Sequence, residues 1–166
     1  MQIKKILVPF DNSKYSDESL KYAVDLAKVV FLGNSSKQDT RILLVHVIQE
    51  LPITKSLFDT PTSNKESKKT SLSQHTSAIY DEMKNSIEKS VREKISKFTS
   101  IDGVKIDFVI LYGNPANEIV DFANKNNVDL LIMGSNGLQG LAKIRGLGSV
   151  SRKVSERVSC PITIIR

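Results

Sequence analysis

Short apolar runs alternate with amphipathic segments along most of this chain. The apolar runs occupy positions 4–10, 41–48, 105–113, 128–134 and 160–166. Each run has the length of a strand, and several are apolar at consecutive positions, which is typical of strands buried on both faces of a sheet. Between the runs, apolar residues recur every three or four positions, as on one face of a helix. The pattern therefore predicts strands that alternate with helices.

Four helices are predicted between these strands, at 16–30, 78–100, 115–127 and 149–159. Ser16 is the expected N-cap of the first helix, and Asn114 followed by Pro115 is a typical start for the third. The second helix carries an apolar stripe at helical spacing, made of Ile79, Met83, Ile87, Val91, Ile95 and Phe98. The simplest interpretation of this stripe is a core-facing surface. A docking surface for a partner is the alternative.

Residues 52–77 interrupt the alternation. Of these 26 residues, 11 are Ser or Thr and four are Lys. No hydrophobic periodicity is present, so this segment is predicted to be a mobile loop.

The order of the remaining elements predicts an α/β fold. Strands that alternate with helices form an open parallel five-stranded sheet with helices on both faces, in a single Rossmann-like domain over residues 1–166. In such sheets, ligands bind at the carboxyl ends of the strands, near the point where the strand order reverses. Three strand ends are therefore of interest: "VPFDNS", "VHVI" and "MGSNG".

The first two of these ends carry polar groups that suit a nucleoside. Asp11 follows the first strand, and its carboxylate can accept hydrogen bonds from ribose hydroxyls or an adenine amine. A turn or capping Asp is the competing interpretation, and from Asp11 alone it is favoured. Backbone groups at Val47 suit a flat base. His46 lies in an apolar run and is interpreted as a core histidine and not a catalytic group.

The third end carries the strongest signal. Five of the eight glycines fall within residues 133–154. Gly134 and Gly137 are expected to let the backbone approach an anion and to adopt positive φ. Gly148 and Ser149 precede the last helix, whose N-terminal N–H groups favour a phosphate. Ser149 and Ser151 are expected to add hydroxyl donors. A tight crossover turn is the alternative interpretation of these glycines.

Composition limits the class of protein. Apolar residues make up 40% of the chain and charged residues 25%, which is ordinary for a globular protein. No apolar run approaches the roughly 20 residues that span a bilayer. The single cysteine excludes an internal disulfide, and the cytoplasm is the expected location.

The net charge of +6 is concentrated near the glycines. Residues 143–157 carry Lys143, Arg145, Arg152, Lys153 and Arg157 against Glu156. This basic segment suits a small anionic ligand, while a solvated helix face is the competing interpretation. Nucleic acid stays a minor option, since a basic patch attracts any polyanion, but the segment has no interleaved aromatic residues to stack on bases.

Other nucleotide motifs and catalytic groups are missing from the sequence. There is no G-x-x-x-x-G-K-[ST] P-loop, and the first strand is not followed by G-x-G-x-x-G. No general base, acid pair or metal cluster is recognised near the glycines, so a true enzyme is not expected. A slow hydrolysis of ATP that relies on magnesium and backbone donors stays open.

The chain resembles the universal stress protein family. The resemblance rests on "KKILVPFDNS", "LLVHVI", "VDLLIMGSNG" and "GSVSRKVSERVSCPITIIR", in that order, and covers nearly the whole chain. It implies a sheet order of 3-2-1-4-5 and a homodimer made through the last strand at Ile162, Ile164 and Ile165. It also implies either a branch that binds ATP through Gly-x2-Gly-x9-Gly-[Ser/Thr] or a branch that binds no nucleotide.

Carried over by position, the resemblance implies a site for ATP, AMP or ADP, with any Mg²⁺ held through the phosphates. Asp11 would hold the ribose or adenine, and Val47 would contact the adenine through its backbone. Gly134, Gly137, Gly148 and Ser149 would line the phosphates. The remaining members of the implied site are Pro9, Phe10, Met133, Ser135, Asn136, Val150 and Ser151.

The glycine spacing departs from the family pattern. Ten residues separate Gly137 from Gly148 where the ATP-binding branch has nine. If Gly146 were the third glycine, Leu147 would stand where Ser or Thr is required. One extra residue near Arg145–Gly146 is therefore inferred, and it affects the grip on the β- and γ-phosphates more than the grip on adenosine.

The expected function is that of an ATP-binding regulatory protein in the stress response, with a protein partner that the sequence does not identify. The alternative from another class is a nucleotide-free dimeric interaction module of the same family.

Overall fold

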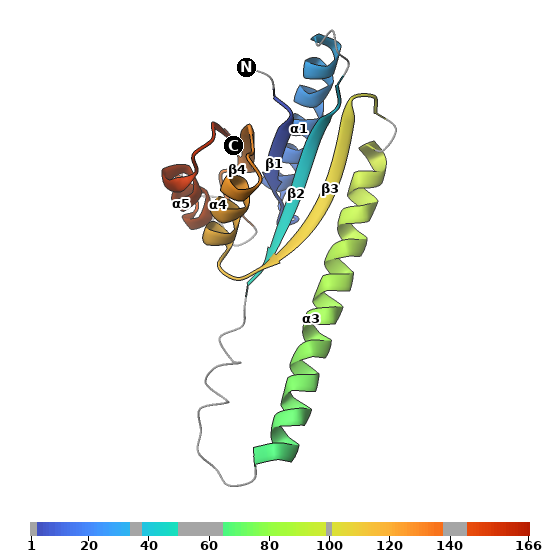
Figure 1. Cartoon of the computed structure of the whole chain (residues 1–166), viewed down its shortest axis with the longest axis vertical. Helices are drawn as coiled ribbons and strands as arrows, with labels where there is room; N and C mark the ends of the chain where they lie inside the picture. The colour runs from blue at the N-terminus through green and yellow to red at the C-terminus, as the bar shows by residue number, and fades with distance from the viewer. Residues whose placement is uncertain (1–2, 34–37, 50–64, 99–100, 138–145) are drawn as a thin grey trace. The chain divides into compact units, whose positions relative to one another are not determined.

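The predicted strands form one sheet in which all strand pairs are parallel. The computed structural model describes residues 3–33, 38–49, 65–98, 101–137 and 146–166, and only the backbone at 65–77. The strands are β1 (Lys5–Pro9), β2 (Thr40–Ile48), β3 (Val104–Tyr112), β4 (Leu130–Gly134) and β5 (Ile162–Ile165). Their order across the sheet is β3-β2-β1-β4-β5, which confirms the expected order (Figure 1).

Helices cover both faces of this sheet. The described helices are α1 (Lys14–Gly33), α3 (Lys65–Ile95), α4 (Pro115–Lys125) and α5 (Ser149–Arg157), and a 3-10 turn, η1 (Ser96–Phe98), follows α3. α1 contacts β1, β2 and β4, whereas α4 contacts β2 and β3 and packs against α5. The order of elements is therefore the one predicted for an α/β domain.

The alternation of buried strand residues shows which helix covers which face. Leu7, Leu43 and Leu131 pack with α4 and α5 in one core cluster, which contains no residue of α1. Neighbouring residues of a strand point to opposite faces. Ile6 and Ile42 are fully buried as well, so they lie on the other face, which α1 covers. Burial on both faces explains the continuous apolar runs of the strands.

The start of α1 differs from the prediction. The helix begins at Lys14, and its cap is Ser13, whose Oγ accepts a hydrogen bond from Ser16 N at 3.2 Å. Ser16, the predicted cap, instead donates its own hydroxyl to the Ser13 carbonyl at 2.9 Å. Asn12 has a φ of 65°, so the chain turns sharply after β1 and brings Ser13 into the capping position earlier than the apolar pattern indicates.

The predicted loop over 52–77 is wrong for residues 65–77, because α3 begins at Lys65. Residues 50–64 lie outside the described residues. The helical part has no apolar periodicity, and six of its 13 residues are Ser or Thr. Its helix continues into the amphipathic segment that follows, and extending an existing helix costs less than nucleating one. The lack of an apolar stripe at helical spacing was therefore no evidence against a helix in this segment.

α3 belongs to a second compact unit, residues 50–96, which follows β2 and precedes β3 along the chain. The sheet, α1, α4 and α5 belong to the other unit, residues 1–49 and 97–166. α3 ends at Ile95, ahead of the predicted end at 100. Within the described ranges, no helix combines the length and the apolar character that crossing a membrane requires.

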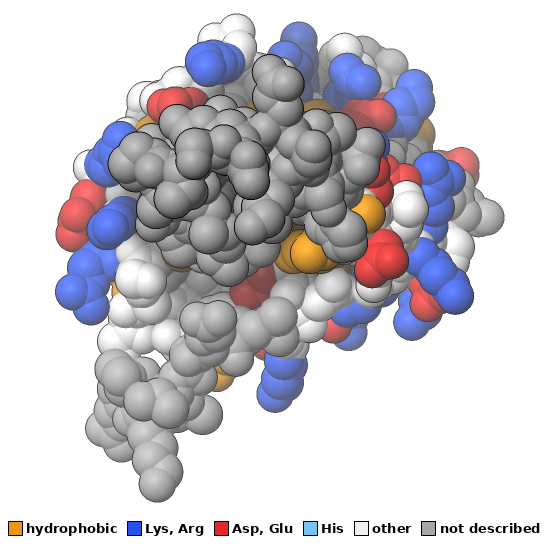
Figure 2. All heavy atoms as spheres, turned by 90° about the horizontal axis from the view of Figure 1, so that it is seen from below, with side chains coloured by type: hydrophobic (Ala, Val, Ile, Leu, Met, Phe, Trp, Pro, Cys, Tyr) orange, Lys and Arg blue, Asp and Glu red, His pale blue; other side chains and the backbone are white. Residues whose placement is uncertain are grey.

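Charged side chains of both signs share the surface. On the face drawn in Figure 2, Lys and Arg side chains are interspersed with Asp and Glu side chains. Among the side chains coloured there, positive charge does not gather into one broad patch.

Candidate functional site

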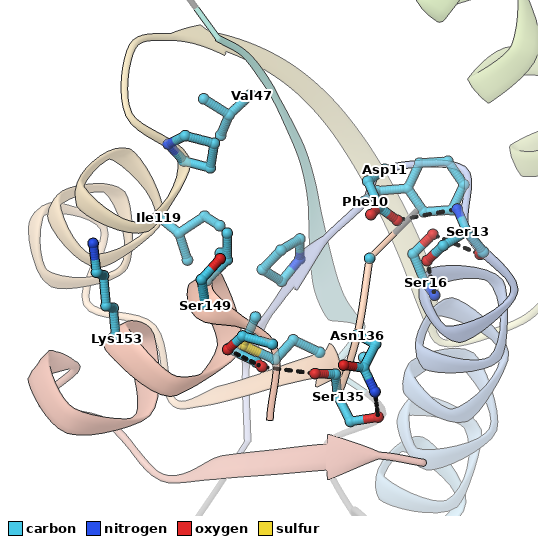
Figure 3. Close-up of a pocket in the computed structure, with 18 of the residues that line it drawn as sticks. Phe10, Asp11, Ser13, Ser16, Val47, Ile119, Ser135, Asn136, Ser149 and Lys153 are labelled. Atoms are coloured by element: carbon cyan, nitrogen blue, oxygen red, sulfur yellow. Dashed lines mark hydrogen bonds between the residues drawn. The ribbon is translucent and has the colours of Figure 1, made fainter. Parts of the chain in front are cut away.

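One pocket of about 860 Å³ lies at the carboxyl ends of β1, β2 and β4, beside the N-terminal turns of α4 and α5. All of the site residues predicted from the sequence line it: Pro9, Phe10, Asp11, Val47, Met133, Gly134, Ser135, Asn136, Gly137, Gly148, Ser149, Val150 and Ser151. Figure 3 shows Asp11, Ser13 and Ser16 at the α1 side, and Ile119, Ser149 and Lys153 at the side of α4 and α5. The fold therefore gathers three separate strand ends into one cavity.

Asp11 serves the turn and also lines the pocket. Its Oδ1 accepts a hydrogen bond from Ser13 N at 3.0 Å, which fixes the carboxylate relative to the start of α1. A Cβ atom placed on Gly137 would lie 2.5 Å from Asp11 Oδ2, so the carboxylate rests directly against the backbone of the glycine loop. In this position Asp11 can both fix the turn after β1 and bind a ligand, so the two interpretations of this residue are compatible.

Gly134 and Gly137 do not adopt the positive φ expected of them, because the described glycines with positive φ are Gly103 and Gly113. These two positions require glycine because there is no space for a side chain. A Cβ atom on Gly134 would lie 2.6 Å from Cβ of Tyr15, and one on Gly137 would collide with Asp11. These glycines permit close approach within the protein, of α1 to β4 and of the loop to Asp11.

The N-terminus of α5 presents donors to the pocket. Gly148 is the N-cap residue, no side chain caps the helix, and its first turn holds no acidic residue. The first N–H groups of a helix have no partner within the helix, and its dipole adds partial positive charge there. Ser149 and Lys153 lie one turn apart on the same face of α5, and both line the pocket. This end of the pocket suits an anion.

Ser151 has a different role from the one predicted. Its hydroxyl is buried and donates to the Ser135 carbonyl at 2.8 Å, with the Gly148 carbonyl also in range at 3.1 Å. Gly148 N donates to the same Ser135 carbonyl at 2.8 Å. The hydroxyl proton of Ser151 therefore ties β4 to α5, and only Ser149 of the two serines keeps a hydroxyl for a ligand.

The backbone of Val47 faces the pocket at the point where β1 ends. The last hydrogen bond between the two strands runs from Phe10 N to the Val45 carbonyl, at 2.7 Å. In a parallel sheet, successive residues of a strand direct their N–H and C=O groups to alternate neighbours. Val47 therefore directs both groups toward the side of β1, which ends at Pro9. A donor and an acceptor lie side by side in the cavity wall.

His46 is bound to the same turn. Its ring Nδ1 lies 2.7 Å from the Phe10 carbonyl, and since a carbonyl only accepts, Nδ1 carries the proton. Burial lowers the pKa of His46 below its usual value, while the Phe10 carbonyl and the charge of Asp11 oppose this effect. His46 is partly buried, as expected, but it also lines the pocket.

Arg152 and Lys153 of the basic segment also line the pocket, and the lining residues that the sequence did not indicate are Ser13, Ser16, Val45, Gln49, Pro115, Ile119 and Leu147. Helical periodicity offered a signal for Lys153, because it stands four positions after Ser149. Pro115 and Ile119 had none, because they depend on how α4 packs beside α5. Among the described residues, no group of three or more His, Cys, Asp or Glu side chains is arranged to hold a metal ion.

Comparisons with known proteins agree on one family. The sequence model of the universal stress protein family matches residues 2–166. Universal stress protein YxiE of Bacillus subtilis is 31% identical over 165 residues, which cover 98% of this chain and 98% of that protein.

Solved structures show the same fold. Universal stress protein UspA from Lactobacillus plantarum has a TM-score of 0.76 and 18% identity, covering 100% of this chain and 99% of that one. The universal stress protein from Archaeoglobus fulgidus, solved in complex with dAMP, has a TM-score of 0.61 and 19% identity over the full length of both chains.

Proposed function

Because this chain belongs to the universal stress protein family, we propose that it is a cytoplasmic stress-response regulator whose pocket binds an adenine nucleotide, ATP foremost. One observation carries the proposal. The outward-facing backbone of Val47, the carboxylate of Asp11 and the uncapped N-terminus of α5 line one cavity. These are the groups that a base, a sugar and a phosphate each require.

The base is recognised by Val47. Adenine offers an amine donor beside a ring-nitrogen acceptor on one edge, and the C=O and N–H of a single residue complement that pair. Apolar side chains surround this part of the cavity, among them Ile119 and Met133. They provide the flat, dry surface on which a ring buries its faces.

The sugar and phosphates extend from the base toward α5. Asp11 accepts hydrogen bonds from the ribose hydroxyls, with its orientation fixed by Ser13 N. The N–H groups at the start of α5 and the hydroxyl of Ser149 receive the phosphates. Lys153 supplies positive charge on the same face. The related structure solved with dAMP supports a nucleotide of this class.

Nucleotide-stripped protein tests the proposal by isothermal titration calorimetry with AMP, ADP and ATP, each with magnesium. We expect saturable binding, and no binding at millimolar ATP would overturn the proposal. Asp11→Asn and Ser149→Ala should each weaken binding about tenfold, which corresponds to roughly 1.4 kcal/mol. Ser155→Ala is the matched control, because Ser155 lies on α5 outside the pocket and donates to the Arg152 carbonyl.

Regulation by binding, without rapid turnover, is part of the same proposal. Among the residues that the structure describes, the ionisable side chains that line the pocket are Asp11, His46, Arg152 and Lys153, and Asp11 is engaged with Ser13 N. His46 directs its protonated nitrogen to the Phe10 carbonyl and not to a water nucleophile. The wild type and a Ser149→Ala variant should therefore release phosphate from ATP at similar rates. A much higher rate in the wild type would show that the protein is an enzyme.

The competing function is a nucleotide-free dimeric interaction module. β5 favours a dimer, because in the described part of the chain it is an edge strand paired with β4, and Ile162, Ile164 and Ile165 are partly exposed. Edge strands of this kind associate with a second copy. Analytical ultracentrifugation of the wild type and of Ile164→Lys tests the dimer. Dimerisation together with a failure to bind any adenine nucleotide would favour the competing function.

A further inference from the structure

The hydrogen-bond ladder between β1 and β2 ends one bond earlier than the register of the two strands would allow. Its last bond runs from Phe10 N to the Val45 carbonyl. In the alternation of a parallel ladder, the next bond would run from Val47 N to the Phe10 carbonyl. That carbonyl accepts from the ring of His46 instead, at 2.7 Å. The side chain of His46 therefore holds the carbonyl that a longer ladder would direct to the backbone of Val47.

We propose that His46 is a positioning residue that keeps the N–H of Val47 available for a ligand by holding the carbonyl of Phe10 out of the ladder. The inference rests on the proposed nucleotide function for its consequence, but its structural part concerns only these three residues. His46 does not touch the ligand in this role. It determines whether the N–H of Val47 is directed to the cavity or forms a hydrogen bond within the sheet.

The physical reason is the direction of one carbonyl. A carbonyl oxygen can accept two hydrogen bonds, so the imidazole does not exclude Val47 N by filling this acceptor. It does so by direction, because the side chain of His46 stands off the sheet whereas a ladder bond lies within the sheet. Phe10 as a whole is only 3% exposed, so the loss of the imidazole donor favours a replacement donor from the protein. When the imidazole donor is removed, the nearest donor in register is Val47 N. The ladder then extends by one bond and consumes the N–H that the base requires. The same movement draws in the backbone that leads to Asp11, which follows Phe10 directly.

Two substitutions separate the donor from the bulk of the side chain. His46→Leu keeps an apolar side chain of moderate size and removes the donor. His46→Asn keeps an N–H group close to the position of the imidazole Nδ1. Amide hydrogen exchange followed by NMR is the measurement, with the amide of Val45, inside the ladder, as internal reference.

In the ligand-free wild type, the Val47 amide should exchange much faster than the Val45 amide. In His46→Leu it should become protected by at least tenfold, and in His46→Asn it should stay fast. A Val47 amide that exchanges equally fast in His46→Leu and in the wild type would overturn the inference. Slow exchange of this amide in the ligand-free wild type would also overturn it.

A second measurement needs no substitution and covers the case in which His46→Leu does not fold. The ¹⁵N shifts of the His46 ring at pH 8 should show a neutral imidazole protonated at Nδ1. Protonation at Nε2 alone would overturn the inference.

Binding then links the inference to function. The affinity for AMP should fall about tenfold in His46→Leu and be retained in His46→Asn. If the wild type binds no nucleotide, the proposed function fails, while the exchange rates still decide the role of His46. If the wild type binds and His46→Leu binds equally well, the inference fails and the proposed function stands.

Discussion

The carboxylate of Asp11 lies in the space that a side chain on Gly137 would occupy. A Cβ atom built on Gly137 falls 2.5 Å from Asp11 Oδ2, while Oδ1 accepts from Ser13 N at 3.0 Å. The loop after β4 and the turn after β1 thus meet at a contact that leaves no space for a side chain on Gly137. This contact joins two parts of the pocket that lie far apart in sequence.

Gly137→Ala should therefore weaken nucleotide binding more than it lowers stability. The new methyl group displaces the carboxylate from the position in which it would accept from the ribose, which should weaken affinity roughly fivefold, or about 1 kcal/mol. Calorimetric titration with AMP measures the effect. Gly33→Ala is the matched control, because nothing lies within 4 Å of its added Cβ. Equal affinities of Gly137→Ala and the wild type would contradict the role assigned to this contact.

Ser151→Ala should lower stability. The hydroxyl of Ser151 is 2% exposed and joins α5 to the Ser135 carbonyl, so its loss should cost about 1–2 kcal/mol of unfolding free energy. Urea denaturation followed by circular dichroism measures this. Ser155→Ala, on the exposed side of the same helix, should stay within about 0.5 kcal/mol of the wild type. A loss of affinity in Ser151→Ala without a loss of stability would restore the hydroxyl as a ligand group.

His46 should make the protein less stable in mild acid. Burial holds its folded-state pKa below the value in the unfolded chain, about 6.5. The unfolded state therefore binds more protons as the pH falls. The contribution of His46 is complete above pH ~6.5, is lost as the pH falls from there through the lower folded pKa, and changes no further below it.

The difference in unfolding free energy between the wild type and His46→Asn, measured from pH 8 to pH 5, isolates this effect. We expect the difference to move against the wild type as the pH falls. A difference that does not depend on pH would show that His46 titrates alike in both states.

Cys160 should react slowly with alkylating agents. Burial raises the pKa of this thiol above its usual value, so little of the nucleophilic thiolate is present near neutral pH. At pH 8, iodoacetamide should modify the folded protein several-fold more slowly than the urea-unfolded protein. Mass spectrometry after timed quenching gives both rates. Equal rates would mean that the thiol is as accessible and as acidic in the fold as in the unfolded chain.

Local patterns carried much of the fold and most of the site. The apolar runs located every strand to within a few residues, because burial on both faces requires apolar residues at consecutive positions. The positions of Asp11, Val47 and the glycines at strand ends placed them at one edge of the sheet, because parallel strands end on the same side. The pattern failed at residues 65–77, because the sequence of this part of α3 has no apolar periodicity by which a helix could be recognised.

What the sequence determined by itself was the order of the elements, the family and the strand-end residues that reach the pocket, but not the lining residues that α4 contributes. The tertiary structure alone decided how those residues are used. It showed that Gly134 and Gly137 provide space and not an unusual φ, and that the hydroxyl of Ser151 binds the Ser135 carbonyl. It also showed that His46, and not Val47, takes the Phe10 carbonyl. Each of these depends on where one strand ends relative to its neighbour, and that register is set by contacts between segments far apart in the chain.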